Sequence, residues 1–465
     1  MEATTLRFRE RAAAALADTQ LQVALAGIKA GWQAGRTRAA ARLPEFEQLR
    51  DLGKAVKDHA LAHLDLYLEA FEARVVEQGG QVHWARDAAE ARTIVLELCR
   101  AVGARSVTKS KSMIAEEIGL NAWLEANGLR VVETDLGEYI IQLRREPPSH
   151  LVGPAVHLTK EQIADLFVAH HGGPRIDEPA ALVGEARKIL RQRYLEADVG
   201  ITGANFLIAE TGSAVTVTNE GNAELTQGLP RTQIVIASLE KVIPTIEDAF
   251  TLLRLLGRSA TGQEFSAYTT FMTGPRRPGD LDGPESFHVV LLDNGRSAMV
   301  GTAFREMLRC IRCGACMNHC PVYLAAGGHA YGWVYVGPMG SVLTPQFIGI
   351  EQGHPLPNAS TFCGRCEEVC PVRIPLPRLM RLWREEQFRK ALVPPTARWG
   401  LGLWAAAARR PWLYRLMTRW AGRALRLLAR GRGRLASVPL AGGWTGTRDL
   451  PAPQGATFMD QWRRR

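Results

Sequence analysis

Two cysteine-rich motifs in the second half of the chain constrain its fold more than any other feature. The first reads CIRCGACMNHCP, from Cys310 to Pro321, and the second reads STFCGRCEEVCP, from Ser360 to Pro371. The second motif has three cysteines where the first has four. The C-x₂-C-x₂-C-x₃-C-P spacing is typical of loops that hold a cubane iron–sulfur cluster and send their fourth cysteine to a second cluster. The motifs therefore predict a ferredoxin-type region with two clusters.

Crossed ligation divides the seven thiols into two sets. Cluster 1 takes Cys310, Cys313, Cys316 and Cys370, and cluster 2 takes Cys320, Cys363 and Cys366. Ser360 stands where the first cysteine of the second motif would be. The fourth position of cluster 2 could hold a Ser360 alkoxide, a ligand from elsewhere, a water-derived oxygen, or no iron, which would give a [3Fe–4S] cluster. Zinc is the competing metal, but two well-separated ligand pairs fit this spacing badly.

The compartment follows from the termini and the cysteine usage. The first twenty residues mix acids and bases without the unbroken apolar stretch of a signal peptide, and the apolar run WGLGLWAAAA is too short to span a membrane. We therefore expect a cytoplasmic protein, where clustered thiols serve as metal ligands rather than disulfides. The eighth cysteine, Cys99, lies mid-helix on the apolar side with Val95 and Val102, which indicates a small buried hydrophobe.

Alternating helical and strand-like segments predict a doubly wound α/β domain, a parallel sheet covered by helices. QVHWA, RSVTKS, TQIVIAS and FHVVLLD are expected strands, LRVVETDLGEYIIQL is expected to be strand throughout, and SMIAEEIGLNAWLEANG is an expected helix. A chain of 465 residues is too long for one compact core. The expected parts are an N-terminal helical region (1–75), the α/β domain (76–300), the ferredoxin-type region (301–390) and a basic amphipathic C-terminal region (391–465).

Positive charge is concentrated in the C-terminal region. Between Gln387 and Arg448 there are 12 Arg, one Lys and no acid, which exceeds the net charge of +10 for the whole chain. Five of these arginines follow helical spacing from 415 to 430, beside an apolar face that includes Trp420. Such a helix suits contact with a membrane surface through 395–434, or packing on the cluster region or a partner subunit. Nothing else in the chain supports nucleic-acid binding.

Two segments of the α/β domain are candidate ligand sites. TKSKS (108–112) could receive an anion through Lys109, Lys111 and a helix start, or it could be a capped helix with solvated lysines. GITGAN and AETGSA place Gly203 and Gly212 at strand ends, where α/β folds bind ligands, although turn chemistry explains the same residues. Glu210, Thr211 and Ser213 flank the second of these turns. No nucleophilic triad, dinucleotide fingerprint or phosphate loop is present, so no catalytic residue is assigned.

The chain resembles lactate utilization protein B, the iron–sulfur subunit of the bacterial L-lactate oxidation system. LRCIRCGACMNHCPVY, STFCGRCEEVCPV and GITGANFLIAETGSAVTVTNEGN carry the resemblance, which extends over most of the chain. It implies a Rossmann-like LUD domain, related to CoA transferases and sugar-phosphate isomerases, followed by a ferredoxin-type module and a family-specific tail. It also implies two [4Fe–4S] clusters, even though relatives commonly lack a cysteine at the Ser360 position. A cysteine-rich subunit and a second LUD protein are the implied partners.

The expected function is electron transfer within an NAD-independent L-lactate dehydrogenase complex that converts L-lactate to pyruvate. Two alternatives remain open at this point: a LUD domain that itself oxidises a hydroxy acid, or a scaffold subunit whose clusters only shape docking surfaces. Peripheral contact with the inner face of the membrane is an additional expectation.

Overall fold

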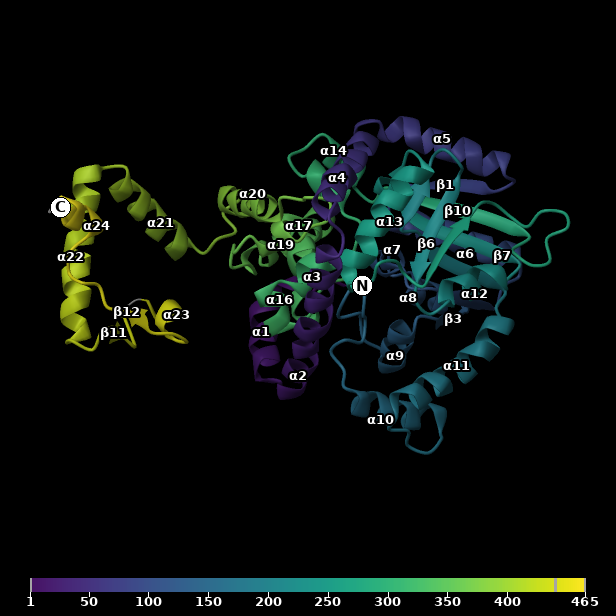
Figure 1. Ribbon diagram of the computed structural model, residues 1–465, viewed down its shortest axis with the longest axis horizontal. Coiled ribbons are helices and arrows are strands. Elements are labelled where there is room, and N and C mark those ends of the chain that lie inside the picture. The colour runs from purple at the N-terminus through teal and green to yellow at the C-terminus, as the bar shows by residue number, and fades with distance from the viewer. Residues whose placement is uncertain (1, 439–440, 464–465) are drawn as a thin grey trace. The chain divides into compact units, whose positions relative to one another are not determined.

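The protein is described by a computed structural model that covers residues 2–438 and 441–463 (Figure 1). The chain forms two compact units, Met1–Glu386 and Gln387–Arg465. The first unit contains the N-terminal helices, the α/β domain and the cysteine motifs together. The second unit contains the basic tail.

The N-terminal region is helical, as the periodicity predicts. Its elements are a 3₁₀ turn (Thr5–Arg7), α1 (Phe8–Ala17), α2 (Thr19–Ile28), a π turn (Lys29–Gln33), α3 (Ala34–Ala41), α4 (Phe46–Ala62) and α5 (Leu64–Glu77). The Asp18 carboxylate caps α2 by accepting a hydrogen bond from the Leu21 backbone N–H. The α4 helix buries Leu49 and Val56 on one face.

A six-stranded sheet, parallel throughout, forms the centre of the first unit. Its strands are β1 (Gln81–Ala85), β2 (Ser106–Lys109), β3 (Arg130–Glu133), β4 (Val199–Gly203), β7 (Thr232–Ser238) and β10 (Ser286–Leu292). The spatial order is β1-β10-β7-β4-β2-β3. When these six strands are renumbered 1 to 6 in chain order and read from the β3 edge, their order is 3-2-4-5-6-1. The usual dinucleotide-binding order is 3-2-1-4-5-6. The predicted parallel sheet is present, in a different strand order.

One face of this sheet is covered by helices. α6 (Ala88–Ala101), α7 (Met113–Glu117) and α8 (Leu120–Ala126) pack their apolar residues on all six strands, and Cys99 lies fully buried in this core. The helix expected over 112–128 is two helices, because Gly119 adopts a left-handed φ of 63° that ends the first one.

The other face of the sheet is covered differently from the prediction. A second sheet, with the order β8-β5-β6-β9, and the helix α5 pack there; α5 runs along the top of the first unit in Figure 1. The strands are β5 (Phe206–Ile208), β6 (Ser213–Thr218), β8 (Val242–Ile243) and β9 (Tyr268–Met272). The α/β domain therefore has helices on one face of its central sheet, as predicted. On the other face it has a small mixed sheet and one helix, where the prediction placed helices alone.

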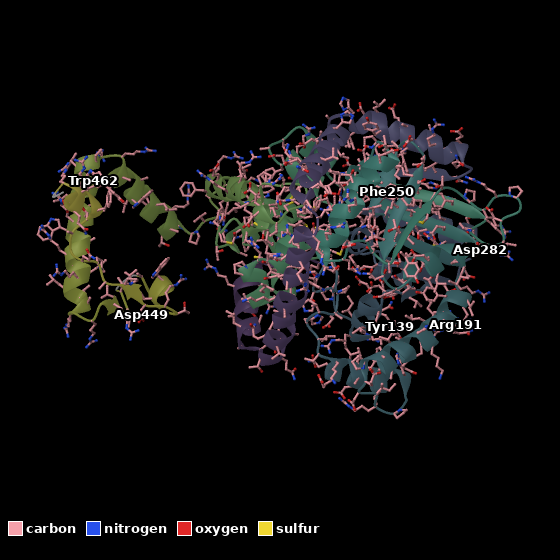
Figure 2. The ribbon with its side chains drawn as sticks, viewed as in Figure 1. Tyr139, Arg191, Phe250, Asp282, Asp449 and Trp462 are labelled. Atoms are coloured by element: carbon pink, nitrogen blue, oxygen red, sulfur yellow. The ribbon has the colours of Figure 1, made fainter. Side chains whose placement is uncertain are left out.

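A helical satellite core lies beside β3. It is formed by α9 (Leu136–Arg144), α10 (Lys160–His171) and α11 (Pro179–Leu195). Tyr139 of α9, labelled in Figure 2, packs edge-on against Phe167 of α10. The strand expected over 129–143 is therefore only β3 followed by α9. Asp135 decides this boundary, because its carboxylate accepts a hydrogen bond from the Glu138 N–H and caps the helix.

The remaining elements of the first unit are mostly short helices and turns. They are α12 (Asn222–Gly228), a 3₁₀ turn (Leu239–Lys241), α13 (Ile246–Ala260), α14 (Ser297–Val300), a 3₁₀ turn (Arg305–Arg309), α15 (Ala315–Asn318), α16 (Pro321–Ala326), a 3₁₀ turn (His329–Tyr331), α17 (Gly337–Ile348), α18 (Ile350–Gly353), a 3₁₀ turn (Leu356–Asn358), α19 (Arg365–Glu368) and α20 (Leu376–Arg389). The cysteine motifs thus lie in short loops between short helices, as cluster-binding regions require.

The second unit is built around two helices, α21 (Pro395–Ala408) and α22 (Pro411–Ala429). Its other elements are β11 (Arg434–Leu435), α23 (Gly442–Thr445), β12 (Leu450–Pro451) and α24 (Phe458–Trp462). Arg419 of α22 pairs with Asp460 of α24. Trp404 and Trp420 are exposed. Among the described residues, no helix is both long and apolar enough to cross a membrane.

Candidate iron–sulfur sites

The two cysteine loops repeat the same backbone conformation at matched positions. Arg312 and Phe362, each directly before the second position of its motif, have φ values of 59° and 55°. Gly314 and Gly364, two positions further on, have φ values of 76° and 80°. Each glycine then starts a short helix, α15 or α19. Left-handed residues turn the chain tightly enough for three successive cysteines to face one point.

The first set of predicted ligands meets around one cavity. Cys310, Cys313 and Cys316 line it from the first motif, and Cys370 lines it from the second. The rest of its wall is largely apolar and includes Ile311, Met317, Met339, Val372, Ile374 and Leu376. The structure therefore brings together the four thiols that the crossed arrangement assigns to cluster 1.

The second set meets around a separate cavity. Cys363 and Cys366 of the second motif, Cys320 of the first, and Ser360 all line it. The Ser360 hydroxyl accepts a hydrogen bond of 3.1 Å from the Phe362 backbone N–H. Cys363 is exposed, whereas Cys320 and Cys366 are buried. Ser360 thus lies beside the three thiols, and this group of residues reaches solvent at Cys363.

The donor chemistry fits iron–sulfur clusters. All eight cysteines are free thiols, and seven of them surround the two cavities in sets of four and three. Packing of α15 against α19 holds the two sets side by side. Four thiolates around an apolar cavity satisfy a cubane cluster, and ligands contributed by both motifs are those of a two-cluster ferredoxin.

Most of the cluster-region thiols are held in their neutral form by burial. Burial raises the pKa of Cys366 to about 12 and that of Cys370 to about 11. Cys363 differs from these two, because the backbone N–H of Arg365 lowers the pKa of its exposed thiol. Metal ligation needs thiolates, so cluster insertion must release protons. The metal–sulfur bonds must then compensate for the burial of the thiolate charge.

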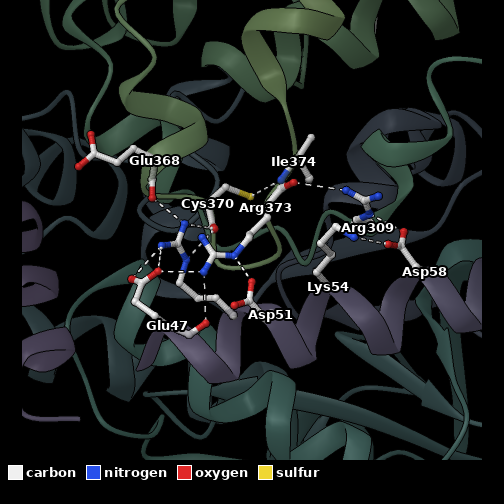
Figure 3. A network of polar contacts seen from close by, with 10 residues as sticks. Glu47, Asp51, Lys54, Asp58, Arg309, Glu368, Cys370, Arg373 and Ile374 are labelled. Atoms are coloured by element: carbon white, nitrogen blue, oxygen red, sulfur yellow. Dashed lines mark hydrogen bonds and ion pairs between the residues drawn. The ribbon is translucent and has the colours of Figure 1, made fainter. Parts of the chain in front are cut away.

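Polar contacts with helix α4 hold the end of the second motif (Figure 3). Arg50 of α4 donates to the carbonyl oxygens of Glu368 at 2.6 Å and Cys370 at 2.8 Å, and pairs with Glu47 at 2.7 Å. Arg373 also pairs with Glu47, at 3.0 Å. The Ile374 backbone N–H donates to the Cys370 sulfur at 3.3 Å. Hydrogen bonds to cluster sulfurs and nearby charge are the protein's means of tuning a cluster potential.

A buried carboxylate connects the α/β domain to the first cysteine loop. Glu240, in the 3₁₀ turn after β7, pairs with Arg296 at 3.0 Å and with Arg312 at 3.2 Å. Lys57 of α4 donates to the Glu240 carbonyl oxygen. Burial acts to raise the pKa of Glu240, but the two arginines outweigh it and hold the pKa at about 2. Glu240 is therefore ionised and anchors the loop that carries Cys313.

Sequence reasoning did not find this supporting shell. Arg36, Arg50 and Glu240 belong to no motif, and their partners lie far away in sequence. A charged residue on the buried face of an amphipathic helix, as at Arg50, is the one signal that could have pointed to it.

The candidate ligand segments of the α/β domain divide into two groups. Lys109 is fully buried and pairs with Glu133 at 2.8 Å and Glu116 at 3.2 Å. Lys111 and Gly203 do line a pocket, described below.

The AETGSA turn has a structural role. Gly212, with φ at 70°, packs against α5 so closely that a Cβ would lie 2.7 Å from the Val75 nitrogen. Glu210 accepts a hydrogen bond from the Ile246 N–H, and Thr211 donates to Ser213.

Together, the parallel α/β domain and the paired cysteine cavities define an iron–sulfur protein with an attached α/β domain. Family models match the LUD domain over residues 68–292, the 4Fe-4S dicluster domain over 306–374 and the C-terminal region of lactate utilisation protein B over 390–465. The chain belongs to the lactate utilization protein B family, which confirms the resemblance.

Curated relatives match along the whole chain, and each is named lactate utilization protein B. The Bacillus licheniformis protein is 42% identical over 471 residues, covering 99% of this chain and 97% of its own. The proteins of Geobacillus sp. (strain WCH70) and Bacillus subtilis (strain 168) are 44% and 41% identical, covering 98% and 99% of this chain and 96% of their own. A crystal structure of a DUF162 family protein from Deinococcus radiodurans is 16% identical and covers 49% of this chain and 98% of its own, with a TM-score of 0.27.

Proposed function

We propose that this chain is the iron–sulfur electron-transfer subunit of an NAD-independent L-lactate dehydrogenase complex, which oxidises L-lactate to pyruvate. The convergence of thiols from both motifs on two neighbouring cavities is the observation that carries the proposal. The relatives' name, lactate utilization protein B, supports the choice of substrate.

In this proposal the ligands are those of the crossed arrangement. Cluster 1 is held by Cys310, Cys313, Cys316 and Cys370, and cluster 2 by Cys320, Cys363 and Cys366. Both are [4Fe–4S] clusters in the resting protein, with the Ser360 side of cluster 2 as the one that can yield a [3Fe–4S] form. Such clusters supply one-electron transfer when bound. The cluster 1 thiols line a largely apolar cavity, whereas Cys363 of the cluster 2 thiols is exposed. We therefore propose that electrons pass between a cluster in the interior and a cluster near the surface.

The experiment is a reconstitution with the partner subunits. The protein is purified anaerobically with the cysteine-rich and second LUD-domain proteins, and cluster reduction is followed by absorbance and electron paramagnetic resonance after L-lactate is added. We expect lactate to bleach the clusters in the complex. The Cys313→Ser variant should lose this response, and the matched Cys99→Ser variant, altered in the sheet core, should keep it. Clusters that remain oxidised in a complete complex would contradict the proposal.

We further propose that the basic tail places the complex at the inner face of the membrane. The α22 helix presents exposed Arg415 and Arg423 together with exposed Trp420 and Leu427, the combination that binds anionic lipid surfaces. Full-length protein should sediment with vesicles containing anionic lipid, and Arg415→Glu with Arg423→Glu should weaken this association. Equal sedimentation of wild type and double variant would instead favour packing of this helix on a partner subunit.

A further inference from the structure

A pocket of about 230 Å³ opens at the carboxyl edge of the central sheet. Ser110 to Ser112 line it after β2, Gly203 to Asn205 at the end of β4, and Lys241 after β7. After β2 the chain continues to β3 at one edge of the sheet, and after β4 it continues to β7 on the opposite side. The pocket therefore lies between β2 and β4, where the strand order reverses. Open parallel sheets bind their ligands at this position.

A buried lysine without an ionic partner faces the pocket. Lys241 is 6% exposed and makes no hydrogen bond or ion pair with any residue of the described chain. The nearby Arg312 guanidinium is engaged by Glu240, and Lys111 is engaged by Asp135. A buried ammonium group is costly unless a negative group compensates it. The pocket therefore presents a buried amino group that no described side chain of the α/β domain holds by a hydrogen bond or an ion pair.

Two other polar side chains that line the same pocket also lack hydrogen-bond partners among the described residues. Ser110 is 2% exposed and Asn222 is 5% exposed, both line the pocket, and neither side chain makes a hydrogen bond within the described part of the chain. Buried hydroxyl and amide groups are nearly always satisfied by protein, water or ligand. Together with Lys241 they form a set suited to an anion that also carries a hydroxyl or carbonyl oxygen.

The pocket shares a wall with the cluster 1 cavity. Leu151, Arg312 and Cys313 line both spaces. A molecule in the pocket therefore lies against the loop that carries a predicted ligand of cluster 1, whereas the cluster 2 thiols border neither space.

From these contacts we propose that the pocket binds a small 2-hydroxy or 2-oxo carboxylate, with its carboxylate on Lys241 and its second oxygen on Ser110 and Asn222. The choice of acid rests on the proposed function, whereas the anion-binding geometry does not. The competing explanation is that Lys241 serves only as a counter-charge for the thiolates of cluster 1.

Calorimetric titration of the anaerobically purified full-length protein with pyruvate, L-lactate and inorganic phosphate tests the proposal. Pyruvate or L-lactate should bind. The Lys241→Gln variant should bind about tenfold more weakly or worse, and Asn222→Ala roughly threefold to tenfold more weakly, as expected for losing a charged and a neutral hydrogen bond. The control Lys188→Gln alters an exposed lysine on α11 and should bind as wild type does. Iron content, measured in parallel, verifies that each variant retains its clusters.

The outcomes separate this inference from the proposed function. Binding of phosphate only, or no binding by wild type, would overturn it, even if lactate reduces the clusters in the complete complex. A Lys241→Gln variant whose cluster 1 potential shifts while acid binding is unchanged would also overturn it, because the lysine would then serve the cluster alone. Acid binding that depends on Lys241 and Asn222 would support it, whether or not the complex transfers electrons from lactate.

Discussion

Single charged residues connect the parts of the first unit. Glu240 is the clearest case, since it is 1% exposed and lies between Arg296 on one side and Arg312 of the cysteine loop on the other. Arg296 has a second partner in Glu117, at 2.7 Å, but no second carboxylate pairs with Arg312 among the described residues. Among the described residues, the charge of Arg312 is therefore balanced by the Glu240 carboxylate alone.

Replacing Glu240 by Gln should destabilise the protein by about 3 kcal/mol, because it leaves buried arginine charge uncompensated. Thermal unfolding of wild type and variant measures the effect. Glu285→Gln is the matched control, since Glu285 forms an exposed ion pair with Arg276 and its loss should cost less than about 1 kcal/mol.

The stability difference between wild type and the Glu240→Gln variant should also depend on pH. The pKa of Glu240 is about 2 in the folded protein, against an ordinary value of 4.5, so its contribution is complete above pH 4.5 and is lost as the pH falls toward 2. The stability gap between wild type and Glu240→Gln should narrow over that interval. Equal melting temperatures at neutral pH would show that the ion pairs carry no net stability.

Ser360 leads to a prediction about cluster lability. It lines the cluster 2 cavity beside three thiols, and Cys363 in that set is exposed. An oxygen ligand holds iron of this kind less firmly than a thiolate does. Exposure to air should therefore convert cluster 2 first, with the electron paramagnetic resonance signal of an oxidised [3Fe–4S] cluster.

The Ser360→Cys variant should suppress this conversion in the isolated chain. Conversion as rapid as in wild type would mean that the hydroxyl serves only the turn, through its hydrogen bond from Phe362. Conversion of cluster 1 instead would contradict the assignment of the thiols.

At the level of elements, the spacing of the cysteines predicts the backbone conformation of their loops. The spacing of apolar residues predicts the strand and helix boundaries less well. Both cysteine loops contain left-handed residues at matched positions, and those positions follow from the motif itself. The strand and helix boundaries depend on competition between local signals. The apolar run after β3 is helical because the Asp135 cap overrides its strand-like composition.

The crossed arrangement gives a prediction at this level. Cys370→Ala should damage cluster 1, although Cys370 follows α19 of the second motif, and Cys320→Ala should damage cluster 2. Spectra of the two anaerobic variants distinguish the clusters. If each substitution harms only the cluster of its own motif, the shared cavities do not reflect the ligand sets.

Across the whole molecule, contacts between parts that lie far apart in sequence are the feature that sequence patterns reveal least. The N-terminal helices share a compact unit with the α/β domain and the cysteine region, and Arg50 of α4 fixes the Cys370 carbonyl. The parallel sheet was predictable because strand-like and helical segments alternate along this part of the chain. The second sheet was not, since β5 and β8 have only three and two residues and depend on tertiary pairing. Two walls of the pocket at Lys241 were predicted, because the TKSKS and GITGAN segments contribute Lys111 and Gly203 to it. Lys241 itself was not, since it follows a strand far from both segments in sequence.

The metal content of the full-length, anaerobically purified protein tests the central claim most directly. Iron, acid-labile sulfide and zinc are measured on the same sample. Two clusters, one of them with an open position, predict about seven to eight irons per chain with a matching amount of sulfide and no stoichiometric zinc. Stoichiometric zinc without acid-labile sulfide would contradict the account.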